Sequence, residues 1–280
     1  MKSWIVEGNR QHLDGGAMFG NAPKALWSRW VKVDAHNRIP LACRTLLIQT
    51  DSGQNILFEA GIGNFFEPKM KERYGIYEQE HTLLKNLEKI GFKPSDIDVV
   101  VLSHLHFDHA GGLLSSYGEE PHLVFPNAII YVSQEHWGRA QKPHIREQAS
   151  FIPLLHQLLL QSGRLKFIEE QTHPDMDFVR FHYSHGHTVG QMISEIEMQE
   201  GPVFFVGDLV PGIPWLHLPV TMGYDRFPEL IVDEKTRLLE FILKNKGRLF
   251  FTHDPDHALI VLSCDDKGRY DADLSADLKT

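Results

Sequence analysis

Ser-His-Leu-His-Phe-Asp-His, at residues 103–109, lies directly after the apolar run Val-Val-Val-Leu at residues 99–102. A short apolar run of this kind predicts a buried strand, and open α/β sheets place their sites at the carboxyl ends of strands. Imidazole nitrogens and carboxylate oxygens are the usual ligands of zinc and neighbouring transition metals. A solvated polar loop is the alternative, and ligand-type residues farther along the chain argue against it. The stretch therefore predicts a metal site at the edge of a sheet.

The later candidate ligands occur in the same setting, because each follows an apolar, β-like run. They are His187 after residues 178–183, Asp208 after residues 203–206 and His253 after residues 249–251. A single histidine or aspartate at the end of a strand is more often a capping or loop residue. Together, and in this order, they strengthen the case for a metal site.

Composition excludes several classes of protein. The chain of 280 residues carries a net charge of −9, which argues against a surface that follows nucleic-acid phosphates. Residues 1–8 lack the apolar core of a secretory signal, and the apolar runs are too short to span a membrane. Cys43 and Cys264 make no disulfide framework. We therefore expect a cytoplasmic protein that acts on a small molecule.

Strand and helix signals alternate along the chain without repeats or a clear linker. We expect one domain over residues 1–280. The predicted helices cover residues 81–90 and 233–246, and residues 145–163 read as helical with a break at Pro153. We treat residues 134–164 as a helical, cap-like insertion. The sequence leaves open whether its apolar side is a core helix, a substrate-facing cap or a homodimer surface.

The remaining signals predict strands in two β-rich halves. They cover residues 5–8, 43–50, 55–59, 98–102, 129–133, 178–183, 192–198, 202–206, 248–251 and 259–264. Helices between strands favour two sheets packed together and covered by helices on the outside.

At this point the ligand pattern resembles the metallo-β-lactamase superfamily, over residues 45–262. The resemblance implies an α/β (α+β) fold, a four-layer αβ/βα sandwich of two mixed β-sheets with helices outside. The run at residues 103–112 is most similar to N-acyl homoserine lactone lactonases and related organophosphate hydrolases. By the same resemblance, the metal ligands are His104, His106, Asp108, His109, His187, Asp208 and His253.

Within that resemblance, His104, His106 and His187 match a first metal site, and Asp208 matches the carboxylate that bridges to the second. Two divalent cations would lower the pKa of a bridging water, so that hydroxide attacks at neutral pH while one cation polarises the substrate. Imidazole at His106, where di-iron relatives place a carboxylate, favours zinc. Iron, manganese and cobalt stay open as alternatives.

Two further residues concern proton transfer and ligand orientation. Asp108 is the candidate that passes a proton to the leaving group, and Tyr224 is a second catalytic candidate, although a packed or surface tyrosine is the alternative. The superfamily's usual Asp-Thr-Gly is here Glu-Ala-Gly at residues 59–61. The sequence leaves open whether Glu59 orients a ligand histidine as that aspartate does.

We interpret the chain as a metal-dependent hydrolase that cleaves a small, apolar ester or lactone. Apolar residues near the predicted site suggest a substrate pocket, for which core packing is the alternative. The candidate pocket residues are Phe19, Phe65, Trp215, His217 and Met222. The alternative functions are a thioesterase like glyoxalase II, a phosphotriesterase, and a catalytically inactive metal-binding scaffold.

Overall fold

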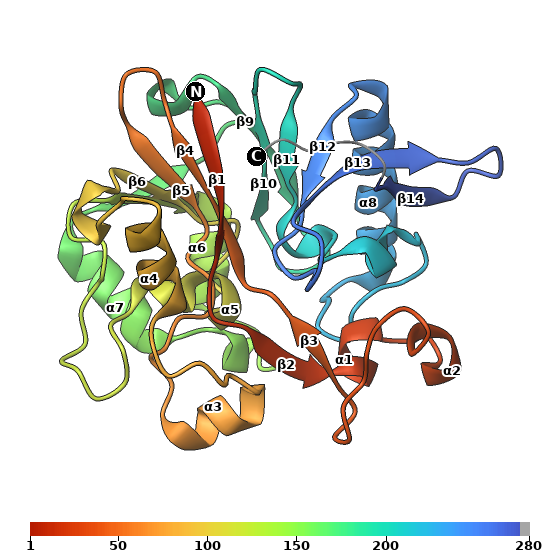
Figure 1. Cartoon of the computed structure of the whole chain (residues 1–280), viewed down its shortest axis with the longest axis horizontal. Coiled ribbons are helices and arrows are strands. Elements are labelled where there is room, and N and C mark those ends of the chain that lie inside the picture. Colours follow the sequence, from red (N-terminus) through yellow and green to blue (C-terminus); the bar gives the residue numbers. More distant parts are fainter. Residues whose placement is uncertain (275–280) are drawn as a thin grey trace. The chain divides into compact units, whose positions relative to one another are not determined.

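Two mixed β-sheets of six strands each organise the chain (Figure 1). The computed structural model describes residues 1–274, and their contacts divide into two units. The first unit comprises residues 1–11 and 42–169, and the second comprises residues 12–41 and the described residues from 170 onward. The predicted α/β class with two mixed sheets is confirmed, whereas the prediction of one domain over residues 1–280 stays a prediction.

The sheet of the first unit carries its strands in the order β1-β4-β5-β6-β7-β8. The bounds are β1 Lys2–Glu7, β4 Arg44–Gln49, β5 Asn55–Phe58, β6 Val99–Val101, β7 Ile129–Ser133 and β8 Leu165–Ile168. β5 to β8 run parallel to one another. Their carboxyl ends therefore meet at one edge, which receives the segments that follow residues 58, 101 and 133.

Helices of the first unit pack on this sheet. α4 (Thr82–Lys89) lies against β1, α6 (Gln134–Gln141) against β7 and α7 (Pro153–Ser162) against β8 (Figure 1). The predicted helix over residues 81–90 is confirmed as α4, because its apolar face buries Leu83 and Leu87 completely. The short helices of this unit are α3 (Pro68–Tyr74) and α5 (Phe107–Ala110).

The helical segment predicted over residues 145–163 is wrong in its first half. α7 begins at Pro153, and only a 3-10 turn over residues 148–150 precedes it. Proline has no backbone N–H to donate and disfavours helical backbone in the preceding residue, so it occupies the first turn of the helix. Pro153 is thus the start of the helix rather than a break within it. Ile152, just before it, is extended with φ −109° and ψ 99°.

The sheet of the second unit carries its strands in the order β14-β13-β12-β11-β10-β9. The bounds are β9 Val179–Ser184, β10 Gln191–Ile196, β11 Val203–Phe205, β12 Arg248–Phe250, β13 Leu259–Cys264 and β14 Tyr270–Asp273. β10 is antiparallel to both β9 and β11, and β12 is parallel to β11. β9, β11 and β12 therefore end at the same edge, where the predicted ligands of this half follow.

α8 (Pro228–Lys244) packs along this second sheet against β13. It starts five residues earlier than the predicted residue 233, because Pro228 stands in its first turn, where the missing N–H costs nothing. The smaller elements of the second unit are α1 (Gly15–Phe19), α2 (Lys24–Trp27) and a two-stranded sheet. In this sheet β2 (Gln11–Asp14), whose first residue belongs to the first unit, pairs with β3 (Arg38–Leu41). Over residues 1–274, no helix has both the length and the apolar character needed to cross a bilayer.

Candidate metal centre

The loop after β6 gathers the ligand candidates of the first unit. The ring centroids of His104 and His106 are 4.4 Å apart, and those of His104 and His109 are 4.0 Å apart. All three imidazoles are buried. Asp108 stands in the first turn of α5, next to His109. The short strand and the short helix thus hold the four ligand candidates of this unit in one cluster.

The residues that follow the array fit closely against the end of β5. Gly112 donates its backbone N–H to the carbonyl of Gly61, and Ala60 donates to the carbonyl of His109. A Cβ at Gly112 would lie 1.9 Å from the carbonyl oxygen of Ala60. Glycine is therefore required at this close approach, which fastens the ligand loop to the sheet edge.

Glu59, which stands in place of the superfamily's usual aspartate, enters this cluster from the end of β5. Its φ of +69° lies in the left-handed region, which costs energy for a residue with a Cβ. The buried carboxylate accepts a hydrogen bond from the backbone N–H of Ser103 at 2.8 Å and lies 3.7 Å from Nδ1 of His109. Donor atoms of Glu59, His104 and His109 all lie within 4.8 Å of one another. Glu59 therefore orders the ligand loop through Ser103, and it approaches His109 beyond hydrogen-bond distance.

Asp108 is oriented by a residue that the sequence analysis did not single out. Gln11 is fully buried, and its Nε2 donates to Oδ2 of Asp108 at 2.6 Å. Oδ1 of the same carboxylate lies 3.9 Å from Nε2 of His109. The amide thus occupies one carboxylate oxygen and turns the other toward the histidine cluster. No motif could have identified Gln11, because it is far from the array in sequence.

The ligand candidates of the second unit meet at the carboxyl edge of its sheet. Nε2 of His187 lies 3.2 Å from Oδ2 of Asp208, and Nε2 of His253 lies 3.1 Å from Oδ1 of the same carboxylate. Both imidazoles are 1% exposed and Asp208 is 6% exposed. Each histidine therefore faces a different oxygen of the Asp208 carboxylate.

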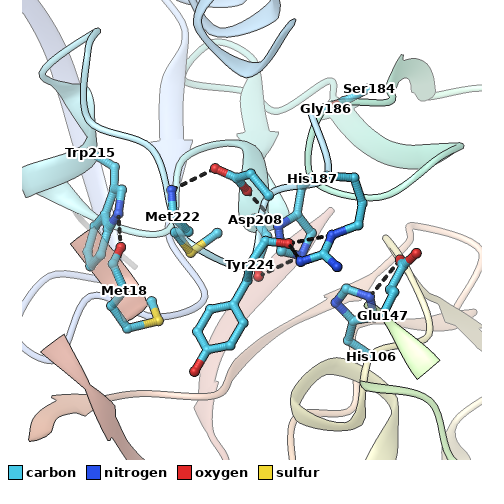
Figure 2. Close-up of polar contacts among 12 residues, drawn as sticks. Met18, His106, Glu147, Ser184, Gly186, His187, Asp208, Trp215, Met222 and Tyr224 are labelled. Atoms are coloured by element: carbon cyan, nitrogen blue, oxygen red, sulfur yellow. Dashed lines mark hydrogen bonds and ion pairs between the residues drawn. The ribbon is translucent and has the colours of Figure 1, made fainter. Parts of the chain in front are cut away.

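A buried carboxylate, Asp225, fixes the orientation of His187. Its Oδ1 lies 2.9 Å from Nδ1 of His187, and its Oδ2 accepts the backbone N–H of Met222 at 2.7 Å. An ionised carboxylate can only accept, so Nδ1 carries the hydrogen and Nε2 carries the lone pair that faces Asp208. Asp225 immediately follows Tyr224. The sequence analysis selected Tyr224 as a catalytic candidate and did not single out Asp225. Tyr224 is 37% exposed, and its backbone carbonyl accepts from Nε of Arg226 (Figure 2).

α8 holds the loop that carries His187. The carboxylate of Glu234 accepts from Oγ of Ser184 at 2.7 Å, from the N–H of His185 at 2.9 Å and from the N–H of Gly186 at 3.1 Å. Glu234 is 8% exposed, so bulk water does not replace these bonds. The loop after β9 is thus tied to the helix directly before the ligand.

Lys235, the next residue of α8, is fully buried and supports the segment after Asp208. Its Nζ donates to the carbonyl of Trp215 at 2.9 Å and to the carbonyl of Val220 at 2.8 Å. Burial lowers the pKa of Lys235 to about 8, while the nearby Asp225 carboxylate acts in the opposite direction. Lys235 thus ties both ends of residues 215–220 to α8.

Most of the predicted pocket residues of the second unit lie in its core. Phe19 stacks on Trp27 with ring centroids 5.2 Å apart and on Trp215 with ring centroids 4.7 Å apart. The indole N–H of Trp215 donates to the carbonyl of residue 18 (Figure 2). Met222 is 3% exposed, whereas His217 is exposed. Core packing accounts for the burial of Phe19, Trp215 and Met222, and their contact with a substrate stays a prediction.

The predicted pocket residue of the first unit, Phe65, belongs to an aromatic cluster beside the metal loop. Phe65 and Phe66 have ring centroids 4.1 Å apart, and Tyr74 lies 4.5 Å from Phe107 by the same measure. Burial raises the pKa of Tyr74 and the negative charge of Asp108 raises it further, while Arg73 lowers it. This aromatic cluster therefore includes Phe107, the residue that follows His106 in the chain.

The residues in each unit fit divalent metal ions. The donors are imidazoles and carboxylates, which suit zinc and neighbouring transition metals. The two oxygens of Asp208 face two different histidines. The carboxylates of Asp225 and Glu147 contact the candidate ligands His187 and His106, respectively, as outer-shell partners of metal sites commonly do.

Comparisons with known proteins agree with this chemistry. Residues 38–253 match the sequence model of the Metallo-beta-lactamase superfamily. An N-acyl homoserine lactonase from a Bacillus species is 29% identical over 217 residues, which cover 75% of this chain and 76% of that protein. The crystal structure of a probable metal-dependent hydrolase from Staphylococcus aureus is 31% identical, with a TM-score of 0.87 over 97% of this chain and 95% of that one. The dizinc quorum-quenching lactonase AidC has the same fold, with a TM-score of 0.77 at 23% identity over 99% of this chain and 95% of that one.

Proposed function

The chain belongs to the metallo-beta-lactamase superfamily as a metal-dependent hydrolase, and from this premise we propose that it opens a small, partly apolar lactone or ester at a pair of divalent cations. In this proposal residues 1–280 act as one catalytic domain. The proposed metal ligands are His104, His106, Asp108, His109, His187, Asp208 and His253.

The arrangement around Asp208 carries the proposal. His187 and His253 address opposite oxygens of its carboxylate, at 3.2 Å and 3.1 Å. This geometry suits a carboxylate shared between two cations, and it supports the proposal of a pair.

The cations, with zinc as the expected metal, would supply a hydroxide nucleophile at neutral pH and a Lewis acid for the substrate's carbonyl oxygen. The protein's own residues would transfer the proton and stabilise the leaving group. Gln11 holds Oδ2 of Asp108 in place, and this carboxylate would accept a proton and pass it to the leaving alkoxide. Tyr224 would donate a hydrogen bond to the same leaving oxygen from its partly exposed position.

The substrate class rests on the relatives and on the apolar surroundings of the ligands. The curated relatives named N-acyl homoserine lactonase share 26–29% identity with about three quarters of this chain. The aromatic cluster of Phe65, Phe66, Tyr74 and Phe107 suits an acyl chain better than a charged group. We therefore propose an acyl lactone, with contacts from the predicted pocket residues.

The test is a hydrolysis screen of the metal-loaded protein with an acyl homoserine lactone, an aryl ester, a thioester and a phosphotriester. We expect about two equivalents of bound metal, fastest turnover of the lactone, loss of turnover with a chelator and recovery on adding Zn²⁺. Faster turnover of the thioester or the phosphotriester would contradict the substrate class. Two bound metals without turnover of any substrate would instead favour an inactive scaffold.

Asp208→Asn tests the bridging role against a matched control. The variant should lose metal and turnover together, because the amide cannot supply two anionic oxygens. Asp271→Asn makes the same change at an exposed position of β14 in the same unit and should leave both unchanged. If Asp208→Asn keeps two metals and wild-type turnover, the assignment is wrong.

A further inference from the structure

An ion pair beside His106 joins Arg139 of α6 to the buried Glu147, which lies between α6 and α7. Nε2 of His106 is 3.1 Å from Oε1 of Glu147 (Figure 2). Nε of Arg139 donates to the other carboxylate oxygen, Oε2, at 2.6 Å. Glu147 is 1% exposed, and the guanidinium of Arg139 supplies the opposite charge that a buried carboxylate requires. The pair therefore presents a carboxylate oxygen to the imidazole as an acceptor.

This acceptor determines which nitrogen of His106 carries the hydrogen. An ionised carboxylate has no proton to donate, so Nε2 must be the donor and Nδ1 must carry the lone pair. His104 has the opposite arrangement, since Oγ of Ser103 lies 2.9 Å from its Nδ1. His104 is thus held through Nδ1 and His106 through Nε2. A metal would therefore bind His106 through Nδ1.

A second contact, from α6, holds Leu105, the residue before His106 in the array. Nε2 of His136 accepts the backbone N–H of Leu105 at 2.9 Å, and His136 is fully buried. The backbone N–H of His136 donates to Oγ of Ser133, the N-cap residue of α6. The backbone of Phe151 also pairs with that of His106 in an antiparallel bridge. Residues 133–151 therefore contact the ligand loop at two successive positions, through side chains and backbone.

We propose that residues 133–151 form a scaffold for the metal loop and that Glu147, held by Arg139, is a positioning residue that makes Nδ1 of His106 the metal-binding atom. The inference rests on the proposed function, because it takes His106 as a metal ligand. It gives this segment a structural task in the metal site, where the sequence left a core helix, a substrate-facing cap and a dimer surface open. It also gives His136 a role that its sequence context did not reveal.

Glu147→Gln is the informative change, because the amide must satisfy Arg139 and His106 at once. Its carbonyl oxygen would turn to the guanidinium donors, which leaves the NH₂ group facing Nε2 of His106. Nε2 would then have to accept, and the hydrogen would move to Nδ1. We expect nitrogen NMR of the metal-free protein to show His106 as the Nε2–H form in the wild type and the Nδ1–H form in the variant.

Metal affinity is the second readout, measured by competition with a chelator. Loss of an outer-shell partner typically weakens metal binding about 10- to 100-fold, and we expect a loss in this range for Glu147→Gln. Glu195→Gln is the matched control, because Glu195 forms a similar pair with His182 at 2.7 Å between β10 and β9, away from the ligands. It should leave the affinity unchanged.

A double change keeps the test decisive if Glu147→Gln does not fold. Arg139→Leu with Glu147→Leu removes both charges together, which proteins tolerate better than the loss of one. It should also weaken metal binding, because Nε2 of His106 loses its acceptor. Wild-type affinity in both the single and the double variant would overturn the inference. A wild-type protein that binds no metal would overturn the proposed function as well, so the two failures are distinguishable.

Discussion

Replacing Glu234 by glutamine tests how far α8 stabilises the loop that carries His187. The carboxylate of Glu234 accepts from three donors, namely Oγ of Ser184 and the backbone N–H groups of His185 and Gly186. Glutamine has nearly the same volume, so the packing of the helix is kept. Only one of its two terminal atoms can accept, and the other is itself a donor.

The expected loss follows from that count of acceptors. At least one of the three donors must face the amide NH₂, and a buried donor without an acceptor costs about 1–3 kcal/mol. The bonds that remain lose the contribution of a charged acceptor, which adds about 1 kcal/mol. We therefore expect the free energy of unfolding to fall by about 3 kcal/mol.

Urea unfolding followed by tryptophan fluorescence measures this free energy. Glu240→Gln is the matched control, because it makes the same change on the same helix at an exposed position. Substitutions of that kind usually change stability by less than about 0.5 kcal/mol. If Glu234→Gln costs no more than Glu240→Gln, the bonds from α8 to the loop do not contribute and the reasoning is refuted.

Four further changes have expected outcomes. Asp108→Asn should keep part of the metal but lower kcat about 100-fold, because the amide cannot carry the proton; metal analysis beside kinetics checks this. Tyr224→Phe should lower kcat for lactones without changing bound metal, and an unchanged kcat would remove the residue from the mechanism. Burial lowers the pKa of His156 from 6.5 to about 4, so folding disfavours its charged form. As the pH falls from 6.5 to 4, the wild type should therefore lose up to about 3 kcal/mol relative to His156→Leu in urea titrations, and parallel pH profiles would disprove the shift. Gly186→Ala would bring a Cβ within 2.6 Å of the Ile231 side chain and should cost about 1–3 kcal/mol, measured as a lower urea midpoint.

The strands and the main helices were predictable because their signals are local. The run at residues 99–102 is apolar and β-branched, and it forms β6. The spacing of Leu83 and Leu87 on one face similarly predicted α4. The start of α7 at Pro153 was misjudged, although the rule that proline occupies the first turn of a helix was available. Strands β2, β3, β8 and β14 were missed, because each has only four residues at the edge of a sheet and therefore a weak pattern.

The sequence by itself determined which metal-binding types of residue the chain offers and the order in which they follow the strands, because ligand chemistry and hydrophobic runs depend on neighbouring positions. Only the tertiary structure decided which side chains orient the ligands. Gln11 reaches Asp108, Asp225 reaches His187 and Glu147 reaches His106 across 97, 38 and 41 residues of chain, respectively. Such partners have no periodicity or spacing to reveal them. They are selected by the shared need of buried polar groups for a hydrogen-bond partner, and that need can be met only once the strands have brought distant segments to the same sheet edge.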